Sequence, residues 1–100
     1  MPPSEKKIII IGAGPTGLGA AYRLKELGYA NFTVYERSPH IGGLASSFTD
    51  PAGFTWDIGG HVMFSHYKYY DDVFDKVMGQ DFQLNMRECW VRMYDTWVPY

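Results

Sequence analysis

Three glycines and one glutamate have the types and spacing that suit a phosphate-binding turn and a carboxylate that binds hydroxyl groups. Gly12, Gly14 and Gly17 follow the apolar run 8–11, and Glu36 comes about twenty residues after them. The first glycine lets the backbone reverse as it leaves a strand, and the second leaves room for a pyrophosphate. The third lets the following helix pack closely on that strand. The glycines therefore predict anion binding by main-chain N–H groups at a helix start.

The residues around these glycines strengthen this prediction. Residues 32–35 are typical of a second strand, and Glu36 stands at its end, where its carboxylate can accept two hydrogen bonds from a ribose. Together these features predict a dinucleotide site, and a purely structural strand-helix-strand turn is the alternative. An acidic residue at this position disfavours a 2′-phosphate, so NADP is the least favoured dinucleotide. NAD remains the competitor of FAD.

The residues after the acid separate these two cofactors. Arg37 and the pair Gly42-Gly43 place a second glycine turn where a loop could fold back over the dinucleotide. This arrangement resembles the extended FAD signature of the amine-oxidase and glutathione-reductase-like flavoproteins, whereas NAD dehydrogenases usually continue with another strand and helix. An ordinary loop or hairpin is the alternative explanation for the glycine pair. In combination with Glu36, the glycine pair favours FAD over NAD.

The elements that must position these residues follow from periodicity and turn signals. Strands are expected at 8–11 and 32–35, with a helix between them that starts near Thr16 and stops at Gly28. Further along we expect strands at 45–49 and 54–58 around a turn at 50–53, a helix over 67–78, and strands at 87–94 and 97–100 around Asp95-Thr96. The aromatic residues of the last two strands are expected in the core: Trp90, Tyr94, Trp97 and Tyr100.

This order of elements predicts an α/β, Rossmann-like FAD/NAD(P)-binding fold that is partial. It has an incomplete parallel sheet, β-hairpins and one further helix. A doubly wound sheet needs more than two parallel strands, so the sheet would be left with an unpaired edge. We therefore expect a second copy of the chain to complete it, as a homo-oligomer.

Composition limits the class of protein. The 100 residues are 46% hydrophobic and 17% aromatic with a net charge of −2, which predicts one globular domain and disfavours nucleic-acid and membrane partners. The polar start of the chain is unlike a signal peptide, so we expect a cytoplasmic protein. Cys89 is the only cysteine, which excludes an internal disulfide and a cysteine-based zinc site and leaves a structural thiol as the expectation.

A family becomes recognisable further along the chain. The segment 56–70, WDIGGHVMFSHYKYY, closely resembles UDP-galactopyranose mutase of the eukaryotic type, as do GGLAS at 42–46 and WVPY at 97–100. The wider superfamily is that of the amine-oxidase and protoporphyrinogen-oxidase-like flavoproteins. The resemblance covers nearly all of this chain but only the amino-terminal part of the family's protein. It implies that residues 1–100 are the amino-terminal part of an FAD-binding Rossmann-like domain.

This resemblance implies a flavin-dependent isomerase that interconverts UDP-galactopyranose and UDP-galactofuranose. The N5 atom of the reduced flavin attacks the anomeric carbon of the sugar, without net oxidation. We expect the 100-residue chain alone to be inactive. The resemblance places Phe64 and Tyr100 toward the UDP-sugar. It assigns fourteen residues to FAD: Gly12, Gly14, Pro15, Thr16, Gly17, Glu36, Arg37, Gly42, Gly43, Leu44, Ser46, Gly59, Gly60 and His61.

The chemistry of the segment Gly59-Gly60-His61 is compatible with this assignment. Two glycines let the main chain approach a flat ring, and a histidine beside the flavin can donate or accept a hydrogen bond. His61 is therefore the predicted catalytic residue. The alternative is a loop histidine that bonds to a backbone carbonyl. His61 and His66 lack helical i,i+4 spacing and nearby cysteines, so no metal site is expected.

A second function shares the same cofactor site. An FAD-dependent oxidoreductase of the protoporphyrinogen-oxidase or amine-oxidase type would use these glycines but transfer hydride from an organic substrate. Leu44 stands where many amine oxidases carry an arginine after the glycine pair, which disfavours an ordinary amine oxidase. The motifs at 59–67 and 97–100 favour the mutase.

Overall fold

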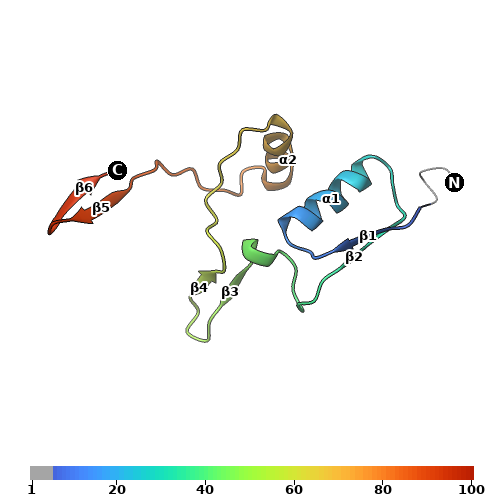
Figure 1. Cartoon of the computed structure of the whole chain (residues 1–100), viewed down its shortest axis with the longest axis horizontal. Coiled ribbons are helices and arrows are strands. Elements are labelled where there is room, and N and C mark those ends of the chain that lie inside the picture. Colours follow the sequence, from blue (N-terminus) through green and yellow to red (C-terminus); the bar gives the residue numbers. More distant parts are fainter. Residues whose placement is uncertain (1–5) are drawn as a thin grey trace. The chain divides into compact units, whose positions relative to one another are not determined.

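The computed structural model describes residues 6–100, which divide into two compact units at residues 63 and 64. The first unit contains a parallel strand pair, one helix and a hairpin. The second contains one helix and another hairpin (Figure 1).

The first unit begins with a strand, a helix and a parallel strand. Strand β1 (Ile8–Ile11) pairs in parallel with β2 (Phe32–Tyr35), and α1 (Pro15–Glu26) forms the connection between them (Figure 1). β-Branched isoleucines favour the extended backbone of β1. Helix α1 ends where predicted, because Gly28 adopts a φ of +73°. There the N–H of Gly28 donates to the carbonyl of Lys25 and the N–H of Tyr29 to that of Leu24, which is a Schellman motif.

Helix α1 covers one face of the strand pair. A Cβ atom at Gly17 would lie 3.3 Å from the side chain of Ile10, so this face of β1 carries the helix. Ile9 and Ile11 point to the opposite face and are 47% and 89% exposed. The only buried hydrophobic side chain in the described range 6–100 is that of Ala13. The partial Rossmann-like sheet is therefore confirmed, and its completion by a second copy stays a prediction.

A short 3₁₀ turn and a hairpin follow the parallel pair. The turn η2 covers Gly43–Ala45, and β3 (Ser47–Thr49) pairs antiparallel with β4 (Thr55–Asp57). The hairpin is confirmed, but both strands are shorter than predicted. The glycine pair bends the chain into the 3₁₀ turn, so the first strand cannot begin at residue 45.

One carboxylate organises the turn of this hairpin. Asp50 accepts hydrogen bonds from the N–H groups of Ala52 (2.9 Å) and Phe54 (3.0 Å) and from the indole N–H of Trp56 (2.9 Å). These donors favour the ionised form and lower the pKa of Asp50, with the indole of Trp56 as the largest cause and the N–H of Phe54 as the second.

We expect this hairpin to loosen as the pH falls. Because the folded pKa of Asp50 is lowered, its contribution is complete above the ordinary aspartate pKa and is lost as the pH falls through the folded value. In Asp50→Ala the indole N–H of Trp56 loses its partner, so its NMR shift should be close to the solvent-exposed value at every pH. In wild type this shift should move toward the solvent-exposed value as the pH falls. Asp81→Ala, in the other unit, is the control and should show the same pH dependence of the Trp56 indole shift as wild type. A Trp56 indole signal that is equal in wild type and Asp50→Ala would contradict this expectation.

The second unit begins with the predicted helix. Helix α2 covers Lys68–Met78, and Lys68 donates to the carboxylate of Asp72 at 2.7 Å on its exposed surface. Gly79 ends the helix with a φ of +55°. The ring of Phe74 contacts that of Phe82 in an edge-to-face geometry, with 5.4 Å between the ring centroids. The expected helix over 67–78 is therefore confirmed, with Tyr67 as its N-cap.

The last hairpin differs from the prediction in its turn. Strand β5 (Trp90–Met93) pairs antiparallel with β6 (Thr96–Pro99), and Met93 lies opposite Thr96. The two central turn residues are therefore Tyr94 and Asp95, with φ values of +48° and +59°. The prediction of a turn at Asp95-Thr96 was wrong by one residue. Thr96 belongs to the ladder, and the turn has two positive φ angles, as in a two-residue hairpin loop.

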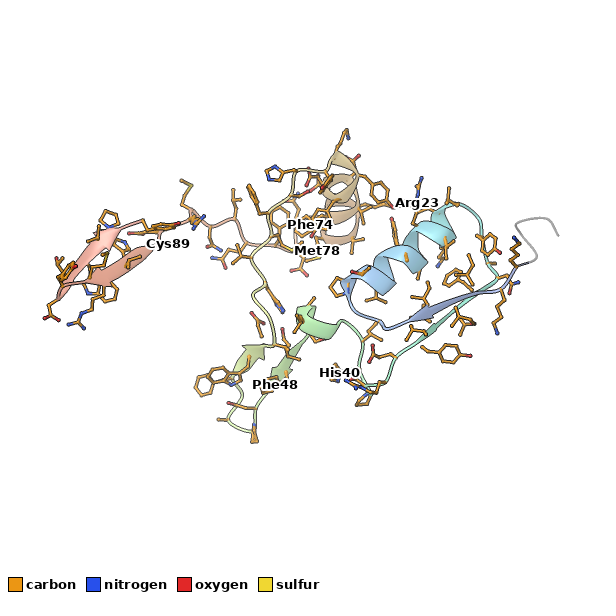
Figure 2. All side chains as sticks on the ribbon, in the orientation of Figure 1. Arg23, His40, Phe48, Phe74, Met78 and Cys89 are labelled. Atoms are coloured by element: carbon orange, nitrogen blue, oxygen red, sulfur yellow. The ribbon has the colours of Figure 1, made fainter. Side chains whose placement is uncertain are left out.

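The aromatic residues of this hairpin are exposed, which contradicts the prediction that they form a core. Trp90 is 51% exposed, Trp97 62% and Tyr100 85%. A two-stranded hairpin has two faces and no layer of its own to cover them. Cys89, which is labelled in Figure 2, is half-buried. Its sulfur accepts a hydrogen bond from Nε of Arg87 at 3.4 Å.

Candidate functional site

The glycine turn has the geometry that its sequence predicts. The N–H of Gly12 donates to the carbonyl of Tyr35 at 2.7 Å, which ties the turn to the end of β2. Gly12 itself adopts a φ of +100°. A Cβ atom at Gly17 would lie 1.9 Å from the carbonyl oxygen of Gly12, so only glycine fits there. A Cβ atom at Gly14 would meet nothing within 4 Å, which leaves open space beside the turn.

The start of α1 suits an anion. Gly14 is the N-cap, Pro15 occupies the first helical position, and the N–H of Leu18 makes the bond to the Gly14 carbonyl at 3.0 Å. The N–H groups of Thr16 and Gly17 precede it, and helix geometry gives them no partner inside α1. The first turn of α1, which the structure describes completely, contains no acidic side chain. The positive end of the helix is therefore left for an external negative charge.

Glu36 connects the glycine turn to the loop after β2. Its Oε2 accepts the N–H of Ala13 at 2.8 Å, and its Oε1 accepts the N–H of Ser38 at 2.8 Å. The N–H of Ser38, as the largest cause, and that of Ala13 lower the pKa of Glu36 by stabilising its charged form. Each carboxylate oxygen has a further lone pair that can accept another donor.

The second glycine pair folds back on the first turn. The N–H of Gly42 donates to the carbonyl of Ala13 at 2.7 Å, and a Cβ atom at Gly43 would lie 3.2 Å from Cα of Gly14. Both glycines have positive φ angles, +108° and +55°. Ser46 closes this loop, since its hydroxyl donates to the carbonyl of Ile41 at 2.8 Å.

A third segment, residues 57–61, contacts the loop of the second glycine pair at Leu44. A Cβ atom at Gly59 would lie 2.6 Å from the carbonyl oxygen of Leu44, so this glycine allows close main-chain contact. Nε2 of His61 lies 3.3 Å from the same oxygen, and its Nδ1 lies 3.2 Å from Oδ1 of Asp57. The contact of His61 with a backbone carbonyl is the alternative that the sequence left open. It leaves the catalytic role of His61 a prediction.

The structure brings most of the predicted residues together within the first unit. The residues of the two glycine loops, with Glu36, Gly59 and His61, connect through the contacts above. Arg37 is exposed beside Glu36. Phe64 and Tyr100 belong to the second unit and are 84% and 85% exposed. Phe64 contacts the ring of His66, with 4.8 Å between the centroids.

Three contributors were missed from the sequence. Ala13 and Ser38 act through their backbone N–H groups, which residue type does not reveal. Asp57 was interpreted only as part of a strand. The sequence contains no signal for its contact with His61, because four-residue spacing brings side chains together only on a helix.

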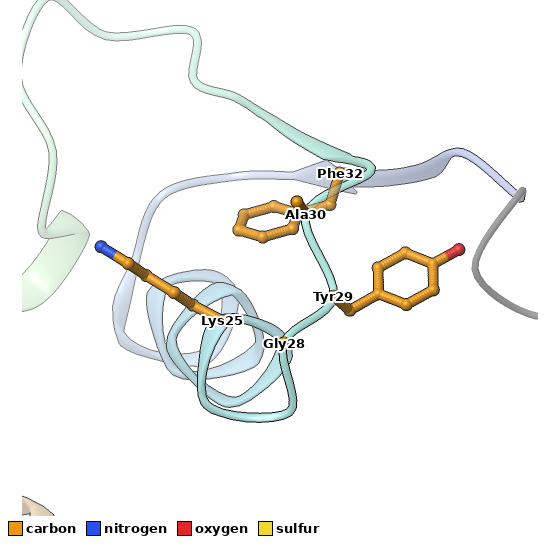
Figure 3. A pocket seen from close by; sticks show the side chains of 5 residues that line it. All are labelled: Lys25, Gly28, Tyr29, Ala30 and Phe32. Atoms are coloured by element: carbon orange, nitrogen blue, oxygen red, sulfur yellow. The ribbon is translucent and has the colours of Figure 1, made fainter.

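The hollow drawn in Figure 3 lies at the other end of α1. It is lined by Lys25, Gly28, Tyr29, Ala30 and Phe32, mostly through apolar surface, and contains none of the predicted site residues. Among residues 6–100, no group of three or more His, Cys, Asp or Glu side chains could hold a metal ion. The helices in that range include none with the length and apolar character needed to cross a membrane.

Comparison with known proteins defines the class of this chain. A family described as an NAD(P)-binding Rossmann-like domain matches residues 10–77, and the chain belongs to this family. Its structure is similar to the crystal structure of reduced UDP-galactopyranose mutase, with a TM-score of 0.83 and 58% identity over 94% of this chain and 20% of that one.

Curated relatives include oxidoreductases. Protoporphyrinogen oxidase 2 of Arabidopsis thaliana is 42% identical over 60% of this chain and 11% of its own length. Zeta-carotene desaturase of Zea mays is 38% identical over 82% of this chain and 14% of its own. The chain therefore spans less than a fifth of these relatives.

Proposed function

We propose that this chain is the FAD-binding portion of a flavin-dependent UDP-galactopyranose mutase. The observation that carries the proposal is the 58% identity to reduced UDP-galactopyranose mutase, which extends over 94% of this chain. The identity to the curated oxidoreductases is lower and covers less of the chain. The reaction is the interconversion of UDP-galactopyranose and UDP-galactofuranose.

The geometry of the first unit fits FAD. The N–H groups at the start of α1 bind the pyrophosphate, and Gly14 leaves room for it. The remaining lone pairs of Glu36 accept the ribose hydroxyls of the adenosine half. The loop from Gly42 to Ser46 packs against the glycine turn and contributes main-chain contacts from its side.

The remaining predicted residues serve the reacting end. FAD, when bound and reduced, supplies the nucleophilic N5 atom that attacks the anomeric carbon of the sugar. Gly59 and Gly60 let the main chain approach the flat ring, and His61 exchanges a proton there. Phe64 and Tyr100 contact the UDP-sugar. UDP would be both the leaving group and the group that returns to the anomeric carbon, so the interconversion would involve no net oxidation.

The test uses the complete gene product that contains these 100 residues. Its bound flavin is reduced with dithionite, and the protein is incubated with UDP-galactopyranose before chromatography of the nucleotide sugars. We expect UDP-galactofuranose in the reduced sample and none in the oxidised sample, which is the matched control. A reduced enzyme that rearranges no sugar would refute the proposal.

The second candidate is an FAD-dependent oxidoreductase of the protoporphyrinogen-oxidase type. The specific observation in its favour is the similarity to plant protoporphyrinogen oxidase and zeta-carotene desaturase. Reduction of the flavin by an organic substrate, without sugar rearrangement in the same experiment, would support this function instead.

A further inference from the structure

The imidazole of His61 lies between two hydrogen-bond acceptors. Nδ1 is 3.2 Å from Oδ1 of Asp57, and Nε2 is 3.3 Å from the carbonyl oxygen of Leu44. A carboxylate and a backbone carbonyl have no hydrogen to donate. Both contacts are therefore hydrogen bonds only when both ring nitrogens carry a hydrogen.

When the ring holds a single proton, the two acceptors compete for it. The carboxylate of Asp57 carries a full negative charge, whereas the carbonyl of Leu44 carries only a partial one. A charge-assisted hydrogen bond is the stronger of the two. The single hydrogen therefore stays on Nδ1, and Nε2 becomes the nitrogen that gains and loses a proton.

Asp57 is itself held in place by the hairpin. The hydroxyl of Ser47 donates to Oδ1 of Asp57 at 2.7 Å, and these two residues lie opposite each other in the β3–β4 ladder. The acceptor for His61 is thus fixed on a strand and not on a free loop. The arrangement of a base oriented by a carboxylate is a common way to fix the tautomer of a histidine.

We infer that Asp57 is a positioning residue that fixes the hydrogen of His61 on Nδ1 and leaves Nε2 as its proton-exchanging atom. This inference depends on the proposed function for the role of His61 in the reaction. The placement of the hydrogen depends only on the contacts of Asp57, Ser47 and Leu44.

The test is ¹⁵N NMR of histidine rings in the complete protein, with the His61 signals assigned from the loss of signal in His61→Gln. In the neutral ring of wild type we expect Nδ1 to be protonated. Asp57→Ala removes the acceptor at Nδ1, so the hydrogen should move to Nε2, where the carbonyl of Leu44 accepts it. Asp57→Glu restores a carboxylate and should return the hydrogen to Nδ1. Asp95→Ala makes the same change at an aspartate paired with Arg92 and should leave the His61 signals unchanged.

Activity gives a second and separate readout. In the reduced-flavin assay Asp57→Ala should lower kcat by up to about a hundredfold with little change in KM, and Asp57→Glu should recover part of it. His61 signals that are identical in wild type and Asp57→Ala would overturn the inference. A tautomer that switches as expected in a protein that rearranges no sugar would support the pairing and refute the proposed function.

Discussion

Gly17→Ala should prevent the first unit from folding into a cofactor-binding state. The added Cβ atom would lie 1.9 Å from the carbonyl oxygen of Gly12 and 3.3 Å from the side chain of Ile10. The first of these atoms is backbone and belongs to the turn itself, so it cannot rotate away. Overpacking of this kind costs about 1–3 kcal/mol or more. We expect the complete protein to lose its yellow colour and to unfold at lower denaturant concentration.

Gly19→Ala is the matched control, because it makes the same change two residues further along α1. A Cβ atom there would meet nothing within 4 Å. Alanine in a helix interior is favoured over glycine by about 0.5–1 kcal/mol, so this variant should be slightly more stable and keep its flavin. Equal flavin content and stability in the two variants would contradict the packing that we describe for Gly17.

Glu36→Ala should lower the affinity for FAD by about tenfold or more. The substitution removes a ribose acceptor and also frees the N–H groups of Ala13 and Ser38, which Glu36 accepts at 2.8 Å. Glu36→Gln should be nearly as damaging, because an amide can accept only one of these two N–H groups and directs its own NH₂ at the other. The measurement is isothermal titration of deflavinated protein with FAD.

Glu26→Ala serves as the control for this substitution. Glu26 forms an exposed ion pair with Arg23 on α1, and exposed pairs contribute little. The affinity of the Glu26→Ala protein for FAD should equal that of wild type. If Glu36→Gln retained full affinity, Glu36 would not be acting through both carboxylate oxygens.

Residues 8–35 could be predicted well because their signals are local. The isoleucine run, the three glycines and the stop at Gly28 each act on neighbouring residues, and all of them have the expected structure. The Gly42-Gly43 loop packs against the glycine turn, and its position over a dinucleotide stays a prediction. What the sequence did not reveal is that Glu36 binds main-chain N–H groups of two loops, because any residue type supplies such a donor.

The predictions that were wrong or incomplete concern features that depend on residues distant in the sequence. The aromatic pattern of β5 and β6 correctly predicts strands, but burial of Trp90 and Trp97 requires a second layer that the pattern does not specify. The role of Asp57 was missed for a related reason. Its carboxylate meets His61 because the chain bends after β4, at Ile58 and Gly59, and a strand pattern carries no information about that bend.

The backbone conformation of the turn at Tyr94 and Asp95 decides which part of the last hairpin stabilises it. Tyr94 and Asp95 both adopt positive φ angles, which aspartate tolerates, but tyrosine is not among the residues that such a loop prefers. Left-handed backbone costs an ordinary residue about 1 kcal/mol or more. The bend therefore opposes its own formation, and the cross-strand pairing of Trp90–Met93 with Thr96–Pro99 must overcome it. The paired strands therefore stabilise this hairpin, and its turn does not.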